Sequence, residues 1–278
     1  MDALVTTQWL ADELGAADLR VVDATYVDAA SGRDPVAEYA AGRIPGAVFL
    51  NLAQLRDTGA DLPNTLPDAE TVADRLSALG IGNTDRIILY DDAPWHTAAR
   101  AWFLLRMFGA RNVAILDGGI AQWRAEGRET VSGDETPAAA AFDAQPDPRR
   151  VRDLADMKAN LDTAAEQVLD ARSAARFTGD EADPRAGVAP GHIPGSSNLP
   201  YGQMFDADGQ WKRGNALKVT FADAGIDLTK PIVTTCGSGI TAAVVAFGAH
   251  LLGNDAALYD GSWSEWGADP ATPKETGQ

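Results

Sequence analysis

The sequence predicts an α/β protein built from two similar domains in tandem, each with a mainly parallel β-sheet and helices on both faces. Short apolar runs typical of buried strands alternate with helical segments along the chain of 278 residues. The same motifs occur twice in the same order, about 145 residues apart, which indicates a duplicated unit. A stretch rich in Pro, Ala and acidic residues separates the copies. We therefore expect domains over residues 1–132 and 150–278, joined by a linker over 133–149.

The individual elements follow from the apolar pattern and from helix-start signals. Thr6 or Thr7 can cap a helix that runs to about Leu14. In the first copy we expect strands at 19–24, 86–90 and 113–116, and helices at 68–79, at 98–108 and around Trp123. In the second copy we expect strands at 167–171, 231–235 and 256–259, and a helix at 242–252.

The repeat places the only cysteine of the chain at the end of a predicted strand. Its anchors pair Asp23 with Asp170, the run 42–47 with 191–196, Asp91 with Cys236, Asp117 with Asp260, and Trp123 with Trp266. Ligands of parallel α/β sheets bind outside the carboxyl ends of the strands, where Cys236 is expected. Because Asp91 cannot act as a thiol nucleophile, we expect the second copy to be catalytic and the first to be non-catalytic.

Cys236 lies in the sequence I-V-T-T-C-G-S-G-I-T-A-A, between a strand and a helix. Gly237 and Gly239 permit a tight loop that turns successive N–H groups inward, and the helix N-terminus adds partial positive charge. Such surroundings favour the thiolate, which is the nucleophilic form of cysteine. The alternative is a small buried residue at a strand end, a common place for a free cysteine.

Composition limits the partners. The net charge of −17 argues against nucleic acids and anionic membranes, and no apolar run has the length of a membrane helix. The N-terminus carries no secretory signal pattern, and one cysteine cannot form an intrachain disulfide. No two histidines have metal-ligand spacing. We therefore expect a cytoplasmic protein without a metal, in which local positive groups would have to attract any anionic substrate.

The motifs together resemble the tandem-domain rhodanese sulfurtransferases, and most of all the mercaptopyruvate sulfurtransferases. They are C-G-S-G-I-T-A at 236–242, Y-D-G-S-W-S-E-W-G at 259–267, D-A-R at 170–172 and the two I-P-G runs. The resemblance covers nearly the whole chain. It implies two rhodanese-like domains and a ping-pong reaction without a cofactor. Cys236 would take sulfur from a small anionic donor, hold it as a persulfide, and pass it to cyanide or to a thiol such as thioredoxin or a small thiol.

The resemblance also implies roles for residues near Cys236. Loop N–H groups would hold the anionic persulfide; the loop residues are Gly237, Gly239, Ile240, Thr241 and Ala242. Ser238 would polarise the substrate or relay a proton. Thr241, from its place at the helix start alone, is expected to cap the helix or bond within the loop. Thiosulfate-using rhodaneses carry basic residues just after the cysteine, and this chain does not. The implied donor is therefore 3-mercaptopyruvate, with its carboxylate and ketone held by Arg176 and Arg185.

The chain departs from this pattern at two positions. Some members of the family place an acidic residue and a histidine of the first domain near the cysteine, and those places fall on Ala53 and Asn64. Neither residue can serve as the same acid or base, so either the proton comes from Ser238 or water, or those two groups are dispensable. Asn64 can still hydrogen-bond the substrate.

Two other functions stay open at this point, and a third is disfavoured. The chain could transfer sulfur from thiosulfate to cyanide, or it could be a sulfur-binding or interaction module without turnover. A cysteine-dependent phosphatase would need an arginine at the sixth position after the cysteine, where this chain has Ala242.

Overall fold

The structure is a computed structural model that describes residues 1–133 and 135–277. Asp134 of the predicted linker and Gln278 of the predicted second domain lie outside the described residues. The chain divides into two compact units. Unit 1 comprises Met1–Thr58 and Leu66–Asp147, and unit 2 comprises Gly59–Thr65 and Pro148–Gln278.

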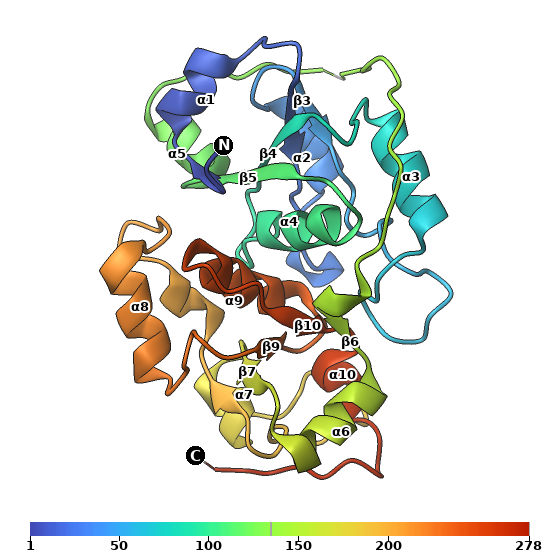
Figure 1. The fold of residues 1–278 in the computed structure, drawn as a ribbon. Helices are drawn as coiled ribbons and strands as arrows, with labels where there is room; N and C mark the ends of the chain where they lie inside the picture. The colour runs from blue at the N-terminus through green and yellow to red at the C-terminus, as the bar shows by residue number, and fades with distance from the viewer. Residues whose placement is uncertain (134, 278) are drawn as a thin grey trace. The chain divides into compact units, whose positions relative to one another are not determined.

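Unit 1 contains a five-stranded parallel sheet with the strand order β1-β5-β4-β2-β3 (Figure 1). Its strands are β1 (Leu4–Val5), β2 (Leu19–Asp23), β3 (Ala47–Phe49), β4 (Arg86–Tyr90) and β5 (Asn112–Leu116). Its helices are α1 (Thr7–Glu13), the short η1 (Ala29–Ser31), α2 (Pro35–Ala41), α3 (Ala69–Ala78), α4 (Ala98–Met107) and α5 (Gly119–Ala125). Of the two candidate caps, Thr6 is the one that caps α1: its side chain accepts a hydrogen bond from the N–H of Trp9.

Unit 2 repeats this arrangement with the strand order β6-β10-β9-β7-β8, again all parallel. Its strands are β6 (Val151–Arg152), β7 (Gln167–Asp170), β8 (Ser197–Asn198), β9 (Ile232–Thr235) and β10 (Ala257–Tyr259). Its helices are η2 (Pro148–Arg150), α6 (Leu154–Thr163), α7 (Ala174–Thr178), η3 (Tyr201–Met204), α8 (Gly214–Asp223), α9 (Ile240–Leu251) and α10 (Ser262–Trp266). Because both sheets have the same order and direction, the predicted α/β duplication is confirmed.

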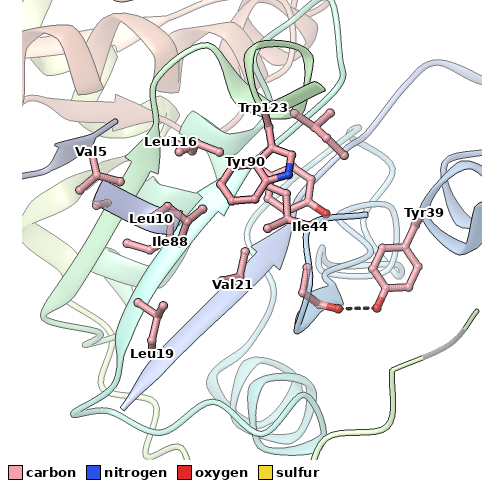
Figure 2. Packing of buried hydrophobic residues seen from close by; sticks show 13 residues of the cluster. Val5, Leu10, Leu19, Val21, Tyr39, Ile44, Ile88, Tyr90, Leu116 and Trp123 are labelled. Carbon is pink, nitrogen blue, oxygen red and sulfur yellow. Dashed lines mark hydrogen bonds between the residues drawn. The ribbon is translucent and has the colours of Figure 1, made fainter. Parts of the chain in front are cut away.

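Each sheet is covered by helices on both faces. In unit 1, alternate residues of the strands pack with residues of α1, α2 and α5, as Figure 2 shows around Tyr90 and Trp123. The Tyr39 hydroxyl on α2 donates a hydrogen bond of 2.6 Å to the Ala47 carbonyl and so joins α2 to β3. On the opposite face, α4 contacts β4 and β5. In unit 2, α6 and α10 cover one face, while α9 contacts β9 and β10 on the other.

The segment predicted as a linker is packed rather than free. Phe142 is buried, and its N–H donates to the Ser77 hydroxyl at the end of α3. Further along, the N–H groups of Gln145 and Asp147 donate to carbonyls at the end of α4. The segment lacks the apolar period of a helix because it packs as an extended strap on unit 1, and the units divide after Asp147.

A buried ion pair stands at the carboxyl end of β7. The Arg172 guanidinium binds both carboxylate oxygens of Asp170, donates to the Gly191 carbonyl, and lies 4.4 Å from the centre of the Trp263 ring. Both side chains are nearly inaccessible, at 2% and 1% exposure. The pair therefore ties β7 to the I-P-G turn and to α10. In the described part of the chain, no helix is long and apolar enough to cross a membrane.

Replacing Arg172 should destabilise unit 2 strongly. Arg172→Ala leaves the Asp170 carboxylate buried without its counter-ion, which costs about 3–5 kcal/mol of unfolding free energy. Urea denaturation measures the loss. The control Lys230→Ala removes a lysine that is 67% exposed and lies 3.8 Å from Asp227, so it should cost less than about 0.5 kcal/mol. Equal losses in the two variants would contradict this account.

Candidate active site

Cys236 follows β9 directly and precedes α9, at the carboxyl end of a strand of the unit 2 sheet. Figure 1 labels both elements. Its side chain is buried, with 2% of the residue exposed. Gly239 caps α9 with a φ of 82°, a left-handed conformation that glycine adopts without steric cost, and its N–H lies 3.1 Å from Sγ of Cys236. The first N–H groups of a helix have no acceptors within the helix. The sulfur therefore lies beside backbone donors that favour negative charge.

Contacts with α10 hold the loop carbonyls away from the sulfur. The Cys236 carbonyl accepts the N–H of Trp263 at 2.9 Å. The Gly237 carbonyl accepts both the N–H of Ser264, at 3.0 Å, and its hydroxyl, at 2.5 Å. The hydroxyl of Ser262 accepts the Cys236 N–H at 3.4 Å. Since these two carbonyls bond to α10 and the Gly239 N–H contacts the sulfur, the loop directs a backbone donor at Cys236.

Arg176 and Arg185 both reach the cysteine loop. A Cβ atom placed on Gly237 would stand 3.2 Å from each Nη atom of Arg185 and 3.6 Å from Nη2 of Arg176. Both guanidiniums therefore lie against the backbone of the residue next to Cys236. A Cβ at position 237 would therefore be in ordinary contact with Arg176, but Arg185 would have to shift by a few tenths of an ångström. Nε of Arg176 is buried without a hydrogen-bond partner in the protein.

One carboxylate holds the two arginines. Asp183, with a side chain only 1% exposed, binds Nη2 of Arg176 at 2.5 Å and Nη1 of Arg185 at 3.1 Å. Burial by itself would raise the pKa of Asp183. The N–H of Arg185 and the two guanidiniums outweigh it and lower the pKa below the ordinary value of 3.8. Two guanidiniums and one ionised carboxylate leave one net positive charge beside Gly237.

Ser238 contacts Asn64, which lies far away in the sequence, in the segment Gly59–Thr65. The contacts of this segment group it with unit 2. Nδ2 of Asn64 donates a hydrogen bond of 3.0 Å to the Ser238 hydroxyl oxygen. Ser238 is 8% exposed. Asn64 has a φ of 59°, a left-handed conformation that asparagine tolerates better than most residues. Ala53, the other departure from the family pattern, is an exposed residue of unit 1.

The corresponding loop of unit 1 contains a carboxylate in place of the thiol. Asp91 accepts the N–H of Ala98, in the first turn of α4, at 2.7 Å and the N–H of Ala93 at 3.1 Å. Burial raises the pKa of Asp91 to about 7, although these two N–H donors act in the opposite direction. The helix N-terminus that faces a sulfur in unit 2 faces a side-chain carboxyl group in unit 1.

Most of the predicted site residues come together in unit 2. Cys236, Gly237, Ser238 and Gly239 form the loop, and Ile240, Thr241 and Ala242 form the first turn of α9. The capping role considered for Thr241 is wrong, because Gly239 occupies the cap position. The predictions missed Asp183, Ser262 and Ser264. All three stand within or close to segments that the sequence analysis singled out. The sequence does not reveal, however, that Asp183 binds the two arginines or that Ser262 and Ser264 bond to the cysteine loop. No group of three or more possible metal ligands occurs within the two described stretches.

The rhodanese-like domain family matches the chain twice, over residues 6–126 and 153–269. The human protein named 3-mercaptopyruvate sulfurtransferase is 40% identical over 271 residues, which cover 95% of this chain and 91% of the human one. An Arabidopsis thaliana protein named thiosulfate/3-mercaptopyruvate sulfurtransferase 1, mitochondrial, is 37% identical, over 99% of this chain and 78% of its own. The crystal structure of SseA from Escherichia coli, described as a 3-mercaptopyruvate sulfotransferase with the rhodanese fold, has a TM-score of 0.86 and 34% identity, over 95% of this chain and 99% of its own. The chain therefore belongs to the rhodanese family, as a sulfurtransferase with two rhodanese-like domains in tandem.

Proposed function

We propose that the chain transfers sulfur from 3-mercaptopyruvate through a persulfide on Cys236 to a thiol or cyanide, releasing pyruvate. The observation that carries this proposal is the pair of guanidiniums against Gly237, both held by Asp183. Arginine binds a carboxylate through parallel hydrogen bonds, and the buried Nε of Arg176 still lacks an acceptor. A donor with a carboxylate at one end and sulfur at the other would match the arginines and Cys236.

The chemistry follows from this placement. The Cys236 thiolate attacks the donor sulfur, the carbon–sulfur bond breaks, and its electron pair passes through the enolate of pyruvate. The proton of the donor thiol finally resides on the methyl carbon, so Cys236 carries one additional sulfur and pyruvate leaves. Gly239 N–H and the first turn of α9 would stabilise the negative charge on the persulfide. These residues act without a cofactor.

Thiosulfate is the second candidate donor, because the Arabidopsis relative is named for both substrates. Thiosulfate is a dianion without a carbonyl group. The site offers one net positive charge and no basic residue within the loop 236–242. The same charge pattern leaves a phosphate dianion poorly neutralised. We therefore propose 3-mercaptopyruvate as the preferred donor and thiosulfate as a poorer one.

The acceptor must bring a nucleophile to the outer sulfur of the persulfide. A small thiol or a thiol protein such as thioredoxin can do so. A reducing compartment such as the cytoplasm would keep the acceptor thiol and the Cys236 thiol reduced. We further propose that residues 1–132 form a non-catalytic domain, since its loop is occupied by the Asp91 carboxyl group. Residues 150–278, joined by Asn64, would form the catalytic one.

Cys236→Ser should abolish sulfur transfer, because a hydroxyl cannot accept sulfur to form a persulfide. Pyruvate release and acceptor thiolation are measured with 3-mercaptopyruvate and with thiosulfate. The unmodified protein should use 3-mercaptopyruvate with the higher kcat/KM. Incubation with the donor alone should add the mass of one sulfur atom to the wild-type chain and none to the variant. A higher kcat/KM for thiosulfate would overturn the donor assignment.

Arg185→Ala should raise KM for 3-mercaptopyruvate by about 10- to 100-fold, the worth of a charge-assisted hydrogen-bonded pair. KM for thiosulfate should change much less. Arg213→Ala, which removes an exposed arginine of unit 2, is the matched charge control and should leave both constants unchanged. Equal increases for both donors in Arg185→Ala would show that position 185 does not bind the carboxylate.

Asp91→Asn should change the pH dependence of stability without changing sulfur transfer. The folded-state pKa of about 7 exceeds the ordinary 3.8, so folding is favoured with Asp91 protonated, and this contribution is lost as pH rises through about 7. The amide of the Asp91→Asn variant does not ionise, so the variant does not lose stability in this way as pH rises. The unfolding free energy of the variant, relative to wild type, should therefore be greater at about pH 8 than at about pH 5 in urea denaturation. A difference independent of pH would contradict the raised pKa.

A further inference from the structure

The contact between Asn64 and Ser238 joins two residues that are far apart in the chain and places an amide beside the sulfur-accepting loop. Nδ2 of Asn64 lies 3.0 Å from Oγ of Ser238. The segment that carries Asn64, Gly59–Thr65, is grouped with unit 2 although the residues before and after it belong to unit 1. The backbone of Asn64 adopts a left-handed conformation to make this approach. This hydrogen bond with Ser238 directs the side chain of a loop residue at the site, as a positioning role requires.

The direction of this hydrogen bond constrains the serine. An amide NH₂ group has two protons to give and no lone pair with which to accept. The Ser238 oxygen is therefore the acceptor, and the single hydroxyl proton of Ser238 remains available for another partner. Since Ser238 follows Gly237, against which Arg176 and Arg185 lie, that partner would be the donor bound there.

We infer that Asn64 is a positioning residue that holds Ser238 as a hydrogen-bond donor to the ketone oxygen of 3-mercaptopyruvate, in place of a proton relay through position 64. This inference rests on the function proposed above. As the carbon–sulfur bond breaks, negative charge moves onto the ketone oxygen, and the Ser238 O–H stabilises it without giving up its proton. The methyl carbon takes up the proton that the donor thiol releases, so no proton has to pass through Asn64.

The decisive variant is Asn64→Asp, which keeps the shape of the side chain and tolerates the same backbone conformation but can only accept. The carboxylate would take the Ser238 proton as its own hydrogen bond and withdraw it from the donor. We expect kcat for 3-mercaptopyruvate to fall about 10- to 100-fold, approaching the loss in Ser238→Ala. In the double variant Asn64→Asp/Ser238→Ala, the aspartate should cost no more than about two-fold beyond Ser238→Ala alone. An undiminished loss in the double variant would mean that the added charge acts independently of Ser238 and would overturn the inference. A kcat at or above wild type in Asn64→Asp would overturn it as well.

Asn64→His supplies a readout that a purely structural role would not move. The imidazolium can only donate a hydrogen bond to the Ser238 oxygen, as Nδ2 of Asn64 does. The neutral ring also carries an acceptor nitrogen, which could take the Ser238 proton as a hydrogen bond. The ratio of variant to wild-type kcat should therefore fall as pH rises through about 6.5. A ratio that rises through the same range would indicate general-base relay and contradict the inference.

Asn83→Asp is the matched control: it makes the same chemical change in unit 1, where Asn83 bonds to the backbone of Asp143, and should leave kcat and its pH profile unchanged. The two hypotheses fail separately. A wild-type kcat/KM that is no higher for 3-mercaptopyruvate than for thiosulfate would refute the proposed donor. Full activity in Asn64→Asp, with Cys236→Ser inactive, would refute only the role of Asn64.

Discussion

The hydrogen bonds between the cysteine loop and α10 are the constraint on which the site depends. A loop that follows a buried strand has carbonyl oxygens as well as N–H groups, and carbonyls directed at Cys236 would repel a thiolate or a persulfide. The carbonyls of Cys236 and Gly237 instead accept hydrogen bonds from Trp263 and Ser264. The start of α10 is therefore as much a part of the site as the cysteine. The Arg172 guanidinium, paired with Asp170, also contacts α10 through the Trp263 ring.

Positive charge is concentrated beside the cysteine loop of a strongly acidic protein. The chain carries a net charge of −17, yet two guanidiniums stand beside the loop. Asp183 neutralises one of them and keeps both in place, so the site offers a fixed fork with a single surplus charge. Such an arrangement matches a monoanion better than a dianion, because the uncompensated charge of a dianion would have to be desolvated.

The duplicated fold uses one geometry for two purposes. In unit 2 the N-terminus of α9 faces the Cys236 sulfur, and in unit 1 the N-terminus of α4 faces the Asp91 carboxyl group. Both are anions or potential anions at a helix N-terminus, the place that the helix dipole favours. The same backbone therefore holds a thiol in one copy and a carboxyl group that accepts two loop N–H groups in the other.

The sequence alone determined the α/β class, the duplication and the place of Cys236, because the strands are short apolar runs and the motifs recur in the same order. It also indicated Arg176 and Arg185, through their resemblance to a known family. The predicted linker shows what the sequence could not predict. An extended strap such as 138–147 has no hydrophobic periodicity, so the sequence gives no sign that it packs on α3 and α4. Only the tertiary structure decided that Asp183 holds both arginines, that Ser264 fixes the loop carbonyl and that Asn64 reaches Ser238. Residues 64 and 238 are 174 positions apart. Local conformational propensities act over a few residues, so a contact at this separation forms only when the whole domain folds.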